Sequence, residues 1–88
     1  MKNTAESSDY NMTKIIAINA GSSSFKFELF EMPEETEIAR GLIERIGLGK
    51  GKFTLSYSGG RETLERNFKT HTEAVNVMLD ALVEKKII

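Results

Sequence analysis

The chain has 88 residues, of which 40% are hydrophobic and 28% charged, which suits one small globular domain and excludes a self-contained two-domain catalytic cleft. Its formal net charge of −1 is scattered without a basic block, and no apolar run is long enough to span a membrane, so neither nucleic-acid nor membrane partners are expected. Cysteine is absent, which excludes disulfides and thiolate chemistry and favours a cytoplasmic protein.

The first twelve residues are polar and lack the apolar stretch of a signal peptide. We interpret residues 1–12 as a flexible leader or tag and residues 13–88 as the folded part. Residues 14–19 form a short β-branched apolar run that ends at a small-residue segment, residues 20–24. This pattern predicts a buried strand followed by a tight loop.

The next segment alternates in character, with Phe25, Phe27 and Leu29 on one face of a strand. Lys26 and Glu28 share the other face with the preceding serine. The two strands therefore read as a β-hairpin with a serine-rich tip.

Residues 38–46 fit two patterns. Ile38, Leu42, Ile43 and Ile46 line one side of a helix that Gly47 would terminate, whereas a strand would place Ile38, Leu42 and Ile46 on one face. The local pattern alone slightly favours a helix.

A second hairpin is predicted from residues 53–57, a glycine-containing turn, and residues 63–68. Thr70 and Glu73 form a capping box ahead of an amphipathic helix that runs to about Lys86. Because apolar residues 87–88 follow the helix directly, we expect further sequence beyond them.

The loop after the first predicted strand has residues suited to a phosphate site. Glycine allows close backbone approach, hydroxyls and backbone N–H groups donate to phosphate oxygens, lysine adds positive charge, and an asparagine amide oxygen suits hydrated Mg²⁺. Most glycine- and serine-rich turns bind nothing, so composition alone leaves both interpretations open. The residues concerned are Asn19, Gly21, Ser22, Ser23, Ser24 and Lys26. His71 is read as a solvated residue at a helix start.

The segment from Lys14 to Phe27, KIIAINAGSSSFKF, closely resembles the opening signature of the acetate and related acyl kinases. Residues 30–35, 41–47 and 71–75 resemble the same family in the expected order. The resemblance therefore covers nearly everything after Met12.

This resemblance implies an α/β fold: the N-terminal part of a ribonuclease H-like, actin-like ATPase lobe, with a mixed β-sheet of hairpins and one C-terminal amphipathic helix. On that basis residues 38–46 become a strand. Site roles also follow from the resemblance. It implies that Asn19 is associated with Mg²⁺ (or Mn²⁺) and that the phosphates of ATP are bound by Lys26, Ser22, Ser24 and Gly21. Phe25 and Glu28 depart from the leucine and glutamine usual in the family.

The implied activity is that of an acetate kinase, which reversibly converts ATP and acetate into ADP and acetyl phosphate, in a parent protein that is a homodimer. The family's catalytic arginine and aspartate motifs are not in these residues, so we assign no catalytic residue here and expect an N-terminal fragment that is inactive by itself. A propionate or butyrate kinase fragment and a non-catalytic interaction module are the alternatives.

Overall fold

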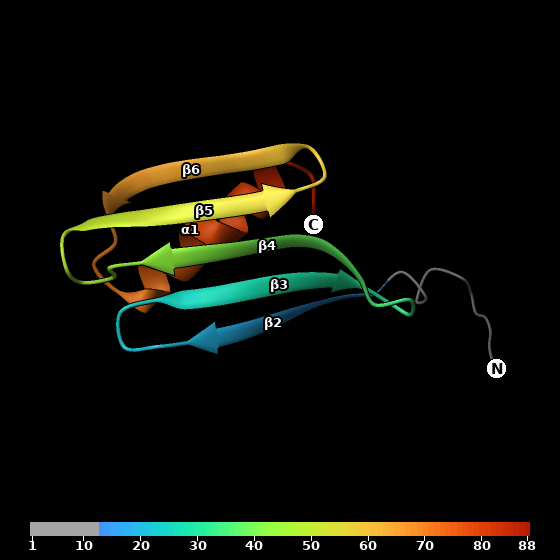
Figure 1. Ribbon diagram of the computed structural model, residues 1–88, viewed down its shortest axis with the longest axis horizontal. Coiled ribbons are helices and arrows are strands. Elements are labelled where there is room, and N and C mark those ends of the chain that lie inside the picture. The colour runs from blue at the N-terminus through green and yellow to red at the C-terminus, as the bar shows by residue number, and fades with distance from the viewer. Residues whose placement is uncertain (1–12) are drawn as a thin grey trace.

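The computed structural model describes residues 13–88, and the leader predicted for residues 1–12 lies outside them. One helix, α1, lies across the back of a single sheet, behind β4 and β5 in the view of Figure 1. This confirms the α/β expectation. In chain order the elements are β2 (Lys14–Ala20), β3 (Phe25–Glu31), β4 (Thr36–Glu44), β5 (Lys50–Tyr57), β6 (Gly60–Asn67) and α1 (His71–Glu84).

The strands lie in the sheet in the order in which they occur in the chain, and each is antiparallel to its neighbours. Both predicted hairpins are confirmed, as β2–β3 and β5–β6. Short connections join only antiparallel neighbours, because a parallel pair needs a long crossover. The parallel pairing that a mixed sheet would require is therefore not found within residues 13–88.

The helix that the local pattern favoured for residues 38–46 is wrong, and the strand implied by the family resemblance is confirmed as β4. The strand pairs with β3 on one side and β5 on the other. Gly41 lies at its centre, where the ring of Phe27 packs over the backbone. Pairing on both edges and this contact outweigh the weak helical periodicity, because strand preference depends strongly on neighbours.

The core lies between α1 and the middle of the sheet. The alternation predicted for β3 is confirmed, since Phe25, Phe27 and Leu29 are buried and Lys26 and Glu28 are exposed. The apolar spacing of α1 likewise turns one stripe of the helix onto the sheet. The buried hydrophobic residues are Phe25, Phe27, Leu29, Ala39, Ile43, Ile46, Phe53, Leu55, Phe68, Ala74, Met78 and Leu82.

Strand β2 forms where the sequence predicts it, but it is not buried. Ile15 is 47% exposed and Ile18 is 52% exposed. The reason is topological: β2 lies at the edge of the sheet that residues 13–88 form, and α1 covers the middle of this sheet rather than that edge. An apolar run predicts a strand but does not report how many neighbours cover it.

The predicted cap of α1 is confirmed. The Thr70 hydroxyl oxygen accepts from the backbone N–H of Glu73 at 3.1 Å, and the Glu73 carboxylate accepts from the N–H of Lys69 at 2.7 Å. The first bond satisfies an amide that the first helical turn leaves unpaired, and in the second the Glu73 carboxylate reaches back to the residue before the N-cap. The helix ends at Glu84, just short of the expected Lys86. Within residues 13–88 there is no helix long and apolar enough to cross a membrane.

Candidate phosphate-binding site

The tip of the β2–β3 hairpin is a tight turn over Ser22 and Ser23. The Gly21 N–H donates to the Ser24 carbonyl at 2.8 Å and closes it. The register of the hairpin then places Asn19 directly opposite Lys26. Because directly opposed residues of an antiparallel pair point to the same face, with Cβ atoms about 5 Å apart, the amide and the ammonium group share one side of the sheet.

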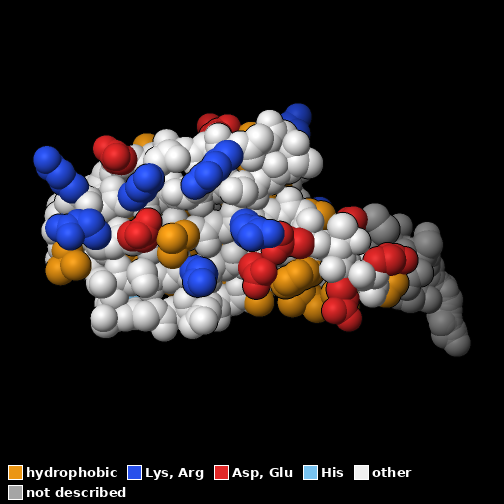
Figure 2. Space-filling view, in the orientation of Figure 1, with side chains coloured by type: hydrophobic (Ala, Val, Ile, Leu, Met, Phe, Trp, Pro, Cys, Tyr) orange, Lys and Arg blue, Asp and Glu red, His pale blue; other side chains and the backbone are white. Residues whose placement is uncertain are grey.

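A hollow of about 240 Å³ lies on this side, which is the face turned away from α1. Figure 2 shows this face, with cationic and anionic side chains interspersed over the sheet. The hollow brings Asn19 and Lys26 together with two charged residues, Glu28 of β3 and Arg40 of β4. Its lining residues are Ala17, Asn19, Lys26, Phe27, Glu28, Arg40 and Gly41.

The other predicted site residues, Gly21, Ser22 and Ser24, lie in the turn beside the hollow and do not line it. Ser22 is exposed at the tip, and Ser24 is half-buried. A side chain at Gly21 would place its Cβ 3.3 Å from the Ser24 hydroxyl, a tight contact. Glycine at this position therefore keeps the hydroxyl and the turn backbone accessible.

Two contacts from distant parts of the chain hold the turn in place. The N–H of Ile46, just after β4, donates to the Ser23 carbonyl at 2.8 Å. Nε2 of His71, at the start of α1, lies 2.9 Å from the Gly21 carbonyl oxygen. Since a carbonyl only accepts, Nε2 carries the proton. Sequence reasoning missed this role of His71, because no local pattern links residues 50 positions apart.

We expect His71→Ala to loosen the turn without unfolding the chain. Losing one hydrogen bond of about 1 kcal/mol should make the Gly21 amide exchange about 5-fold faster, because local opening becomes easier. Amide hydrogen exchange followed by NMR measures this rate. Thr72→Ala, at an exposed neighbouring position, is the control. Equal exchange rates in both variants would contradict the assigned role.

The charged side chains around the hollow do not pair with Lys26, so its ammonium group is available to bind a ligand. No ion pair or hydrogen bond involves the side chains of Lys26 or Glu28 within the described residues. Arg40 instead forms an ion pair with Glu37 of the same strand, with Nη2 2.8 Å from the carboxylate. Residues 13–88 contain no cluster of three or more metal-ligating side chains.

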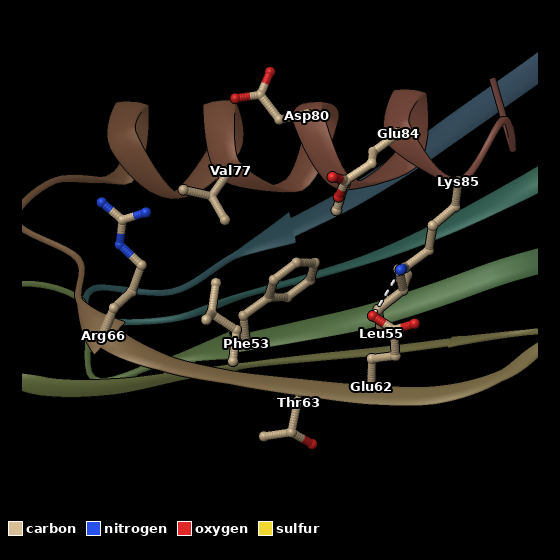
Figure 3. Close-up of a pocket in the computed structure, with 11 residues that line it drawn as sticks. Phe53, Leu55, Glu62, Thr63, Arg66, Val77, Asp80, Glu84 and Lys85 are labelled. Atoms are coloured by element: carbon tan, nitrogen blue, oxygen red, sulfur yellow. Dashed lines mark ion pairs between the residues drawn. The ribbon is translucent and has the colours of Figure 1, made fainter.

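Another hollow, of about 370 Å³, lies between β6 and α1 and contains none of the predicted site residues. Figure 3 shows Glu62 of β6 and Lys85 at the end of α1 meeting there, with Nζ 2.6 Å from Oε1. The Tyr57 hydroxyl also donates to Glu62 at 3.0 Å. These hydrogen bonds lower the pKa of Glu62 and raise the pKa values of Lys85 and Tyr57.

The lowered pKa of Glu62 predicts the direction of a pH effect. A carboxyl whose pKa is lower in the folded state stabilises the protein above its ordinary value of 4.5, and loses this contribution as the pH falls through the lowered value. We therefore expect Glu62→Gln to reduce the urea midpoint at pH 7 more than at pH 3. Glu65→Gln, on the same strand, is the control. A difference independent of pH would contradict the ion pair.

The fold and the hairpin define a class: an α/β chain with an antiparallel sheet, one covering helix, and a glycine–serine turn flanked by an amide and a lysine. The sequence model of the acetokinase family matches residues 14–88. This chain therefore belongs to the acetokinase family.

Relatives of known name agree with this assignment. Acetate kinase of Staphylococcus carnosus is 53% identical over 74 residues, covering 84% of this chain and 19% of that protein. Acetate kinase of Macrococcus caseolyticus is 53% identical over 77 residues, covering 88% of this chain and 19% of that protein. The crystal structure of Porphyromonas gingivalis acetate kinase matches with a TM-score of 0.74 at 37% identity, covering 80% of this chain and 18% of that one. The chain thus spans about one fifth of the length of the relatives it matches.

Proposed function

We propose that this chain supplies the phosphate-binding hairpin of an acetate kinase, which reversibly transfers the γ-phosphoryl group of ATP to acetate, and that it is inactive by itself. The observation that carries the proposal is the placement of Asn19 opposite Lys26 beside the glycine–serine turn, within a family match over residues 14–88. Phosphoryl transfer depends mainly on positioning and on neutralising charge, which these groups serve.

In this proposal Lys26 binds the nucleotide phosphates as a point charge. Its ammonium group is exposed and makes no ion pair within residues 13–88, so it needs no rearrangement to meet an anion. The hydroxyls of Ser22 and Ser24 and the backbone at Gly21 add hydrogen bonds from the turn. Glu28 weakens the positive potential of the same hollow, because it places a carboxylate on the face that Lys26 occupies.

Asn19 would help to hold Mg²⁺ or Mn²⁺ as part of a metal–nucleotide complex. The Asn19 amide oxygen is a suitable hard ligand, but the opposing Lys26 would repel a bare divalent cation. The negative charge of a bound polyphosphate would offset that repulsion, with Lys26 binding phosphate oxygens. Asn19 would therefore hold one side of a hydrated metal–ATP complex, and the metal would neutralise phosphate charge.

The proposal extends to the whole protein: a cytoplasmic homodimer that acts on acetate and ATP, without nucleic-acid or membrane partners. The names of the matched relatives favour acetate over propionate or butyrate as the acceptor. A non-catalytic interaction module is the alternative of a different class. Within residues 13–88, the hairpin offers a cation and hydrogen-bond donors for a phosphate group. We assign no residue in this range to bind or activate the acetate carboxylate.

A chimera tests the proposal. The matching segment of Staphylococcus carnosus acetate kinase is replaced by the aligned part of this chain, and acetate-dependent formation of acetyl phosphate is measured. We expect an active chimera and no activity from the 88-residue chain alone. A folded chimera that binds ATP without turning it over would contradict the proposed function. Turnover by the 88-residue chain alone would contradict the proposed inactivity.

A further inference from the structure

The turn at the tip of the β2–β3 hairpin lacks one backbone bond that its register predicts. Gly21 and Ser24 stand opposite each other just beyond the last pair of the two strands, and a hydrogen-bonded antiparallel pair exchanges two backbone bonds. The Gly21 N–H donates to the Ser24 carbonyl at 2.8 Å, but the reverse bond is not formed. The N–H of Ser24 therefore has no partner within residues 13–88.

The backbone conformation of the turn explains the missing bond. Two-residue hairpins close tightly through turns that have a positive φ at one or both central residues, because only these match the twist of the strands. Neither central residue here, Ser22 or Ser23, has a positive φ. Turns of this kind splay the strand ends. The Gly21 carbonyl and the Ser24 N–H are therefore held apart, and each is left to bond elsewhere.

His71 supplies the other partner of the Gly21 carbonyl. Nε2 of its ring lies 2.9 Å from the carbonyl oxygen, and Figure 1 shows the start of α1 at the same end of the sheet as the turn. In a planar trans peptide the C=O and the following N–H point in opposite directions. A Gly21 carbonyl turned towards His71 therefore turns the N–H of Ser22 away from the helix.

A second bond fixes the peptide between Ser23 and Ser24 in the same manner. The N–H of Ile46 donates to the Ser23 carbonyl at 2.8 Å, so the N–H of Ser24 points away from Ile46. The N–H groups of Ser22 and Ser24 both lack a partner within the described part of the chain. Neighbouring free N–H groups in a turn are a common anion-binding arrangement, and Lys26 follows on the next strand.

We propose that His71 is a positioning residue for phosphoryl transfer, which holds the Gly21 carbonyl so that the N–H groups of Ser22 and Ser24 can donate to the phosphates of ATP. The inference rests on the proposed phosphate-binding hairpin. Without the imidazole donor, the peptide after Gly21 is free to rotate, because glycine tolerates most backbone conformations. Its carbonyl can then bond to the Ser24 N–H or face the phosphate oxygens, which it repels. Both changes weaken the binding of ATP.

Two substitutions separate the hydrogen bond from the packing of the ring. His71→Gln keeps an N–H donor, whereas His71→Leu removes it, and the half-buried position lies outside the core in both. In the active chimera, His71→Leu should raise the KM for ATP about 10-fold, as expected when a hydrogen bond to a charged group is lost, and leave the KM for acetate unchanged. His71→Gln should restore most of this loss. Thr72→Ala, at the exposed neighbouring position, is the control and should change neither KM.

NMR of the intact 88-residue chain locates the donors and does not depend on an active chimera. Adding inorganic tripolyphosphate should move the N–H protons of Ser22 and Ser24 downfield while the amides of β6 stay unchanged, and His71→Leu should require about 10-fold more of the anion.

Three results would overturn the role of His71: no such shift in the unsubstituted chain, equal binding in His71→Leu, or a His71→Gln variant as impaired as His71→Leu. The proposed function fails by a different result, when the folded chimera forms no acetyl phosphate or Lys26→Ala leaves its kcat/KM unchanged.

Discussion

Gly41→Ala should destabilise the chain by about 2 to 4 kcal/mol, the upper range for overpacking a core. The new Cβ would lie 2.2 Å from Cε1 of Phe27 and 2.9 Å from the Thr54 carbonyl oxygen. Neither neighbour moves easily: Phe27 is 1% exposed, and the carbonyl belongs to the adjacent strand. Because a domain this small is marginally stable, we expect a large shift of the urea midpoint.

A double-mutant cycle with Phe27→Leu separates this clash from a general weakening of β4. Leucine shortens the side chain that the new Cβ meets, at its own cost in core packing. The double variant should therefore be less destabilised than the sum of the two single variants, by about 1 kcal/mol or more. Additive losses would contradict the ring contact as the reason for glycine at this position.

The predictable part of this fold was local. The alternation of β3 and the apolar spacing of α1 express periods of the backbone itself, so both elements and their buried faces could be predicted from short windows of sequence. The hairpin register followed from the short turn and placed Lys26 on the polar face. The roles of Lys26 and Asn19 in binding stay predictions.

The unpredictable part depended on neighbours distant in sequence. The pattern of β4 favoured a helix, and pairing with strands on both sides decided otherwise. The apolar run of β2 was predicted to be buried, yet burial depends on what lies beyond the strand, which local sequence does not encode. The contact between His71 and Gly21 joins the helix start to the hairpin tip, and only the packing of α1 on the sheet creates it.

In the active chimera, Lys26→Ala should lower kcat/KM by about 100-fold or more, because it removes a positioned charge from the transferring phosphates. The side chain is exposed and makes no ion pair within residues 13–88, so the variant should fold normally, with an unchanged urea midpoint. A loss of activity would then report on phosphate binding rather than on stability. Lys26→Arg keeps the charge and should retain more activity than alanine.

Lys52→Ala is the matched control, because Lys52 is also an exposed lysine and lies on the same face of the sheet as Lys26. The register shows this: Lys52 stands opposite Glu44 of β4, and Glu44 is on the Lys26 face. Lys52 does not line the hollow beside Asn19, so its removal should change kcat/KM by no more than about 2-fold, as expected for an exposed charge. Similar losses of kcat/KM in Lys26→Ala and Lys52→Ala would mean that this face of the sheet affects the reaction only through its overall electrostatic potential. A specific loss in Lys26→Ala alone would place the phosphates at the hairpin, because only that lysine stands opposite Asn19.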